Sequence, residues 1–233
     1  MRLTAIVPAA GRGRRLNSTV PKQFLSVGDK PVIIYSLEIL DKMPEVRDIV
    51  IAGPAGEIDT IRKLISDFRI GKVTDVIEGG EERTQSVREA FVRVATADYV
   101  LIHDAVRPFI TRELVKRTID AGVSYGAAIS AIPVTDTVKF VAGDGTIVKN
   151  VERGGLWLAQ TPQVFGYGIL SKAYAAYDRR PVETTDEAGL VELTGVKVKV
   201  VKGSIFNIKI TGEDDLVLAK LIAGMMPARR SDL

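Results

Sequence analysis

The chain has no cysteine and a single histidine among its 233 residues. The absence of cysteine excludes disulfides, thiolate catalysis and cysteine-ligated zinc. The single histidine argues against a histidine-rich metal site or a Ser-His-Asp hydrolase. No apolar run approaches the roughly 20 residues that a membrane-spanning helix needs, and no signal-like segment precedes the first predicted strand. We therefore expect a cytoplasmic protein with no membrane partner.

Runs of one charge sign are absent as well. The net charge is only +3, and lysines and arginines alternate with acidic residues along most of the chain. This distribution gives no indication of nucleic-acid binding, so no nucleic-acid partner is expected. The hydrophobic fraction of 46% and the chain length together fit one substantial core better than two. A single domain over residues 1–233 is the resulting prediction.

What the chain does contain is a repeated alternation of short apolar runs and segments with helical spacing. Because the apolar runs are short and end in turn residues, they predict buried parallel strands. The predicted strands cover residues 3–7, 48–52, 73–77, 99–102 and 127–132, and the helices between them cover 31–40, 57–68, 84–94 and 112–121. This order predicts an α/β fold with a Rossmann-like, mostly parallel sheet flanked by helices. Ligands of such sheets bind beyond the carboxyl ends of the strands.

The pattern changes after Pro133. Two alternating segments, 137–141 and 146–151, flank a Gly-Asp-Gly turn and predict a β-hairpin. Because a two-stranded ribbon is marginal alone, it packs on its own domain or reaches a second subunit, and we favour the second for an arm at residues 134–156. The remaining predicted elements are helices at 168–177, 186–193 and 213–225 and strands at 197–201 and 205–210.

The first predicted strand breaks at Pro8 into a loop with the sequence Ala-Ala-Gly-Arg-Gly-Arg-Arg. This loop lacks the third glycine of a dinucleotide fingerprint and the Gly-Lys-Ser/Thr of a Walker A loop, and a bare Gly-x-Gly is more often an ordinary turn. Arg12, Arg14, Arg15 and Lys22, however, place four cations within eleven residues. They would repel one another unless an anion lay among them. With the glycines, they predict a triphosphate-binding loop.

Polar residues near other strand ends are further candidates. Asp104 follows the predicted strand at 99–102, where a carboxylate could hold Mg²⁺ or serve as a loop or capping residue. We expect His103 to be structural. Lys209, before the last helix, could point into the cleft, although an outward-facing lysine is the commoner outcome. Two segments, Thr184-x-x-Glu and Thr211-x-x-Asp, are typical of helix capping boxes.

Several motifs along the chain carry a family resemblance. They are Pro8-Ala-Ala-Gly-x-Gly-x-Arg, Pro21-Lys-Gln, Gly79-Gly-x-x-Arg-x-x-Ser-Val, His103-Asp-Ala-x-Arg-Pro, Asp136-Thr-x-Lys, Arg153-x-Gly-Leu-Trp, Thr161-Pro-Gln, Thr185-Asp-Glu-Ala and Asn207-Ile-Lys-Ile-Thr. In this order they resemble the 2-C-methyl-D-erythritol 4-phosphate cytidylyltransferases of the non-mevalonate isoprenoid pathway. The alternatives are a ribitol-5-phosphate cytidylyltransferase and a nucleotide-binding homologue without turnover.

The resemblance implies a nucleotidyltransferase fold and the transfer of CMP from CTP to methylerythritol phosphate, with Mg²⁺ and release of pyrophosphate. It implies catalytic roles for Arg15, Lys22 and Lys209, and a place for Asp104 beside the metal. The nucleotide-binding residues that it implies are Ala9, Ala10, Gly11, Gly13, Gly79, Glu81, Ser86, Asp104 and Ala105. Glu81 stands where the family often has an aspartate.

The resemblance also gives the predicted hairpin a role. In the family it is an arm exchanged between the two subunits of a homodimer. Residues that match Thr137 and Arg153 bind the phosphate of the sugar alcohol in the partner's site, with Arg107 nearby. A bidentate arginine suits such a phosphate.

Overall fold

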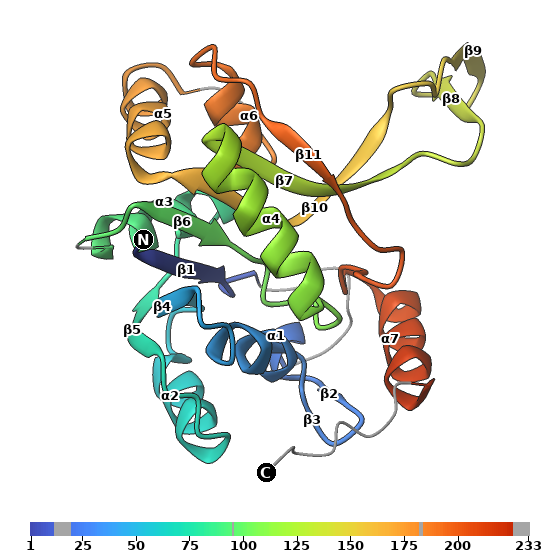
Figure 1. Ribbon diagram of the computed structural model, residues 1–233. Helices are drawn as coiled ribbons and strands as arrows, with labels where there is room; N and C mark the ends of the chain where they lie inside the picture. The colour runs from blue at the N-terminus through green and yellow to red at the C-terminus, as the bar shows by residue number, and fades with distance from the viewer. Residues whose placement is uncertain (12–19, 95, 182–183, 226–233) are drawn as a thin grey trace.

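The computed structural model describes residues 1–11, 20–94, 96–181 and 184–225. Its centre is a seven-stranded sheet with the order β11-β7-β10-β6-β1-β4-β5 (Figure 1). The strands are β1 (Leu3–Pro8), β4 (Val46–Gly53), β5 (Val73–Glu78), β6 (Tyr99–Ile102), β7 (Ala127–Pro133), β10 (Trp157–Gly166) and β11 (Lys199–Lys202). All neighbouring pairs are parallel except those that β10 makes with β6 and β7. The predicted mostly parallel α/β sheet is therefore confirmed.

Helices cover both faces of this sheet. The helices are α1 (Val32–Asp41), α2 (Ile58–Asp67), α3 (Arg83–Arg93), α4 (Arg112–Tyr125), α5 (Tyr167–Arg179), α6 (Glu187–Glu192) and α7 (Glu213–Met225). Alternate residues of β1 point to opposite faces, so Leu3 and Val7 pack with α1, α2 and α4, whereas Ile6 packs with α3, α5 and α6. β1 is thus buried on both sides, which explains its mostly apolar sequence.

A small substructure joins the first strand to α1. A single 3-10 turn, η1 (Lys22–Phe24), leads into the two-residue strands β2 (Ser26–Val27) and β3 (Lys30–Pro31). α7 packs against this ribbon through a separate apolar cluster that includes Val27 and Ile222. Lys22, the first residue of η1, lies close to Gly11, just beyond the end of β1.

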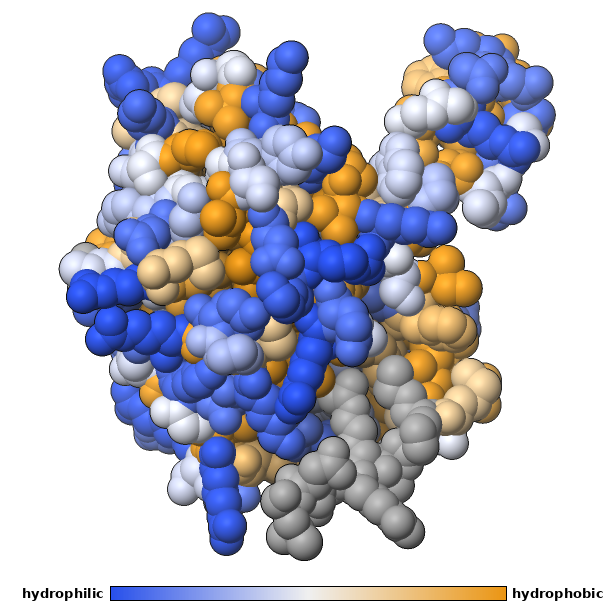
Figure 2. Space-filling view, in the orientation of Figure 1, coloured by the Kyte–Doolittle hydropathy of each residue, from blue (hydrophilic) through white to orange (hydrophobic). Residues whose placement is uncertain are grey.

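The predicted hairpin is present and projects away from the sheet (Figure 1). It consists of β8 (Val138–Val141) and β9 (Ile147–Val151), which pair with each other in a separate sheet. Gly145 has a φ of 86°, the left-handed conformation that the tight turn requires. Apolar side chains on this arm are exposed among charged ones, including Phe140 at 55% and Ile147 at 58% (Figure 2).

Two local predictions are wrong. The segment 205–210 is not a regular strand, because β11 already occupies the sheet edge and the chain turns towards the sheet's carboxyl end instead. Thr184 does not cap α6; Asp186 is the N-cap, and its Oδ1 accepts a hydrogen bond from the Gly189 N–H at 3.1 Å. Within the described ranges, no helix is long and apolar enough to cross a membrane.

Candidate active site

A cavity of about 200 Å³ lies at the carboxyl ends of β1 and β6. Residues from the end of β1, η1, the segment before α3, the end of β6 and the segment before α7 line it. A larger hollow of about 640 Å³ lies beside β5 and α3. We assign the site to the smaller cavity because Lys22, Asp104 and Lys209 line it together, at the edge where parallel sheets bind ligands.

One wall of the cavity is the segment after β1. The Ala9 N–H donates to the Ala52 carbonyl at 2.7 Å, and the Ala9 carbonyl accepts from Nε2 of the buried Gln23, also at 2.7 Å. Because Gln23 belongs to η1, this bond ties Lys22 to the wall, and Lys22 Cε lies 3.9 Å from where a Cβ on Gly11 would be.

The predictions for Gly13 and Arg15, like those for Arg12 and Arg14, lie outside the described residues.

The opposite wall is formed by the turn that enters α3. A Cβ on Gly79 would lie 2.7 Å from the Ala10 Cβ and 2.7 Å from the Ser86 Oγ, so only glycine fits between these two residues. The Ser86 hydroxyl is 2.9 Å from the Glu82 carbonyl, to which it donates. Glu81 is exposed at the cavity rim, where the same turn carries it.

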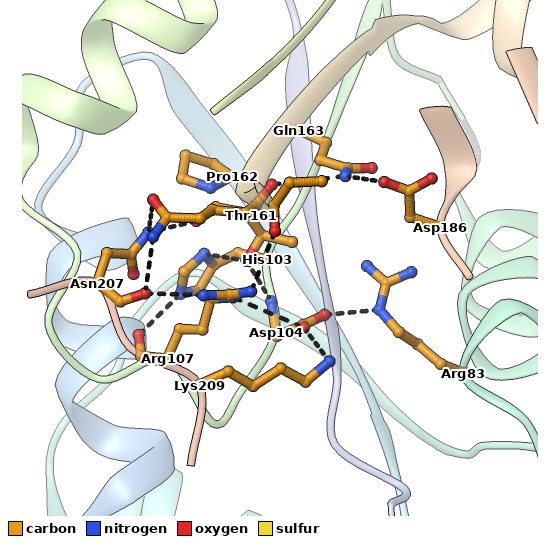
Figure 3. A network of polar contacts seen from close by, with 12 residues as sticks. Arg83, His103, Asp104, Arg107, Thr161, Pro162, Gln163, Asp186, Asn207 and Lys209 are labelled. Atoms are coloured by element: carbon orange, nitrogen blue, oxygen red, sulfur yellow. Dashed lines mark hydrogen bonds and ion pairs between the residues drawn. The ribbon is translucent and has the colours of Figure 1, made fainter. Parts of the chain in front are cut away.

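Asp104 is the anionic centre of the site (Figure 3). Its Oδ1 accepts from Arg83 Nε at 2.7 Å, and its Oδ2 accepts from Lys209 Nζ at 2.7 Å. Arg107 Nε lies 3.9 Å from the same Oδ2. Burial opposes the charge on Asp104, but these three cations outweigh it and hold the pKa of the carboxyl far below its usual range. Asp104 is therefore a carboxylate that orients Lys209.

His103 fixes the backbone behind Asp104. Because the Arg107 carbonyl can only accept, His103 Nε2 carries the proton and donates to it at 3.1 Å. Nδ1 then accepts from the Thr161 hydroxyl at 3.0 Å, and that hydroxyl oxygen accepts from the Asp104 N–H at 3.1 Å. Burial lowers the pKa of His103 to about 4, so the ring is neutral. It lies behind the cavity wall and does not line the cavity.

The structure does not bring the three predicted sugar-phosphate residues together within one chain. Arg107 is nearly buried and donates to the Asn207 carbonyl at 2.7 Å (Figure 3), and burial lowers the pKa of its guanidinium. Thr137 and Arg153 are exposed on the arm, where Arg153 donates to the Thr135 carbonyl. Ala105, another predicted residue, is fully buried beside Pro8, whose carbonyl accepts its N–H at 3.3 Å.

The sequence-based prediction missed two members of the site, Arg83 and Glu187. Arg83 NH1 lies 2.7 Å from Oε2 of Glu187, which is fully buried at the start of α6. Burial works against the charge on Arg83, but Glu187 and Asp104 raise the pKa of its guanidinium above the usual range. Burial raises the pKa of Glu187, and Arg83 opposes that rise. The family motifs contain both residues, but no local sequence pattern showed that they form an ion pair.

Comparisons with known proteins identify the family of this chain. A family model described as 2-C-methyl-D-erythritol 4-phosphate cytidylyltransferase matches residues 3–225. The enzyme of that name from Syntrophus aciditrophicus is 42% identical over 221 residues, which cover 94% of each chain.

Two solved structures have the same fold over nearly the whole chain. The 2-C-methyl-D-erythritol 4-phosphate cytidylyltransferase of Thermus thermophilus is 32% identical, with a TM-score of 0.81 over 96% of this chain and 100% of that one. The 4-diphosphocytidyl-2C-methyl-D-erythritol synthase of Anaerococcus prevotii is 29% identical, with a TM-score of 0.84 over 95% and 96% of the two chains. The chain therefore belongs to the 2-C-methyl-D-erythritol 4-phosphate cytidylyltransferase family.

Proposed function

We propose that this protein transfers CMP from CTP to 2-C-methyl-D-erythritol 4-phosphate, giving 4-diphosphocytidyl-2-C-methyl-D-erythritol and pyrophosphate in the non-mevalonate isoprenoid pathway. One observation carries the proposal: in a chain of this family, Lys22 and Lys209 line the same cavity, and glycines form part of its walls. A phosphate monoester is largely dianionic at neutral pH, so it attacks without a side-chain base. The protein has to align the attacking phosphate in line with the α-phosphorus and neutralise the charge that accumulates there.

The cations of the site fit that task. Lys209 is held by Asp104 at 2.7 Å and lines the cavity, and Lys22 enters from η1 on the other side. We assign both lysines, together with Arg15, to stabilisation of the α-phosphoryl transition state and of the departing pyrophosphate. Because Lys209 is held by its ion pair with Asp104 and Lys22 belongs to η1, little reorganisation is needed when charge develops.

The nucleotide is assigned to the two walls. Gly11 and Gly13 are proposed to approach the triphosphate through their backbone. The residues proposed to lie around the base and ribose are Ala9, Ala10, Gly79, Glu81 and Ser86. Asp104 is proposed to face the metal and the α-phosphate. A Cβ at Gly79 would meet Ala10 and Ser86, so the glycine allows the two walls to pack closely against each other.

Mg²⁺ is proposed to enter with the triphosphate. In the described part of the chain, no three His, Cys, Asp or Glu side chains are arranged to hold a metal ion. Both oxygens of Asp104 already accept from Arg83 and Lys209, so Asp104 fits as one ligand through a remaining lone pair. Phosphate oxygens and water would complete the shell, as is usual for this ion. Bound there, the ion would neutralise charge on the triphosphate.

The arm is proposed to be exchanged in a homodimer. Residues 134–156 would extend from one nucleotidyltransferase domain, residues 1–233, and bring Thr137 and Arg153 to the sugar phosphate in the partner's site, near Arg107. The exposed apolar side chains of the arm, such as Val148 at 56%, support a contact surface there. A cytoplasmic location, as expected from the sequence, is proposed as well.

Pyrophosphate release tests the proposal directly. CTP is supplied with methylerythritol phosphate, with ribitol 5-phosphate, or with neither, and release is followed over time. We expect release with methylerythritol phosphate only. Faster release with ribitol 5-phosphate would show that the chain is a ribitol-5-phosphate cytidylyltransferase. No release with either alcohol phosphate would show that it binds nucleotide without turnover.

A further inference from the structure

Arg83 bridges two buried carboxylates from distant parts of the chain. Its Nε lies 2.7 Å from Asp104 Oδ1, and its NH1 lies 2.7 Å from Glu187 Oε2. The Asp104 side chain is 6% exposed and that of Glu187 is 0% exposed. A planar guanidinium held at two of its edges cannot rotate without losing one of these bonds.

This arrangement takes Arg83 out of the set of phosphate ligands, although it lines the cavity. Two of its donor groups are directed at protein carboxylates. The third, NH2, is buried and has no hydrogen-bond partner among the described residues. The cation therefore acts as a structural link between α3, the end of β6 and α6.

Helix capping does not explain Glu187. Asp186 already caps α6, and Glu187 sits at the first helical position with its side chain turned inward. Tyr174 packs near it, and burial followed by the charge of Glu187 raises the pKa of the tyrosine hydroxyl. A fully buried carboxylate is costly unless it is paired, and removing one partner of such a pair leaves an uncompensated charge. We therefore look for the role of Glu187 in the residue that it holds in place, Arg83.

We propose that Glu187 is a positioning residue for the phosphate-transfer reaction, and the proposal rests on the function proposed above. Glu187 fixes Arg83, Arg83 fixes Asp104 Oδ1, and Asp104 Oδ2 thereby holds the Lys209 ammonium in the cavity. Each of the three links measures 2.7 Å. Glu187 does not line the cavity, and the Nε and NH1 groups of Arg83 are both directed at protein carboxylates. Because small displacements of a group that acts in the transition state cost rate more than binding, the effect falls on kcat.

The test is Glu187→Gln, which keeps the shape and an acceptor oxygen but removes the charge. We expect kcat to fall on the order of 10-fold, with KM for CTP within about 3-fold of wild type. The matched control is Glu38→Gln, which neutralises the carboxylate of another part-buried ion pair, Lys30–Glu38, away from the cavity. Urea unfolding confirms that each assayed variant is folded.

A second variant makes the outcome decisive. Arg83→Lys keeps the positive charge, but one ammonium cannot bridge both carboxylates, so the same loss of kcat is expected. The double variant should be no slower than the slower single variant, because both changes break one linkage. If Glu187→Gln does not fold, Arg83→Lys carries the test alone.

Unchanged kcat in folded Glu187→Gln, or fully additive losses in the double variant, would overturn the positioning role. Wild-type protein that releases no pyrophosphate from CTP and methylerythritol phosphate would instead overturn the proposed function.

Discussion

The single histidine gives a prediction about stability that can be worked out from its surroundings. His103 is fully buried, and burial lowers its pKa from 6.5 to about 4, against opposing contributions from the Arg107 carbonyl and Asp104. The unfolded chain therefore binds one more proton than the folded chain between these two pH values. The contribution of neutral His103 to the free energy of unfolding is fully present above pH 6.5 and is lost as the pH falls towards 4.

The magnitude follows from the size of that shift. Each pH unit in this window costs about 1.4 kcal/mol, so the total loss is about 3 kcal/mol. Asp104 does not contribute here, because a carboxyl whose pKa is lowered loses its stabilisation only below the unfolded value of about 4. The physical reason is local: protonated Nδ1 would no longer accept from the Thr161 hydroxyl.

The assay compares urea unfolding of wild type and His103→Gln at pH 7.5 and 5.0, followed by far-ultraviolet circular dichroism. Trp157 is 43% exposed, so it is a poor fluorescence reporter of the core. The variant is expected to be less stable at pH 7.5, and wild type should lose about 2 kcal/mol more than the variant between the two pH values. Equal losses would refute the assignment of a neutral, buried imidazole.

Three further predictions concern the site. Lys22→Ala should lower kcat/KM by on the order of 10² or more, as expected when a charge contact to the transition state is lost, and near-normal turnover would remove its catalytic role. Arg153→Ala should raise KM for methylerythritol phosphate far more than KM for CTP in steady-state assays; equal effects would count against the arm assignment. Gly79→Ala should weaken CTP binding by calorimetry, because its Cβ would lie 2.7 Å from the Ala10 Cβ and the Ser86 Oγ. CTP affinity equal to wild type would show that the two walls can move apart.

The sequence predicted the parallel strands well because their signals are local. β1 is an apolar run that ends at a proline, and both of its faces are covered, as such a run requires. β10 was not among the predicted strands, and it contains Pro162, a residue type that normally argues against a central position in a sheet. In the structure, the register of β10 against β7 shifts between Ala159 and Gln163, and this irregularity accommodates the proline.

The site was less predictable where partners are distant. Asp104 and Lys209 were singled out because strand ends and the family motifs mark them. Glu187, by contrast, fits a capping pattern locally, and its partner Arg83 is 104 residues away. Nothing in the local spacing shows that α6 turns this carboxylate into the interior.

In the proposed reaction, the bound substrate phosphate attacks the α-phosphorus of CTP directly, with cations of the chain and no nucleophilic side chain. Stereochemistry tests this most directly. The protein is given CTP with a chiral α-phosphorothioate together with methylerythritol phosphate, and the configuration at phosphorus in the product is determined. A single in-line displacement predicts inversion. Retention would require two displacements through a covalent enzyme intermediate and would contradict the account.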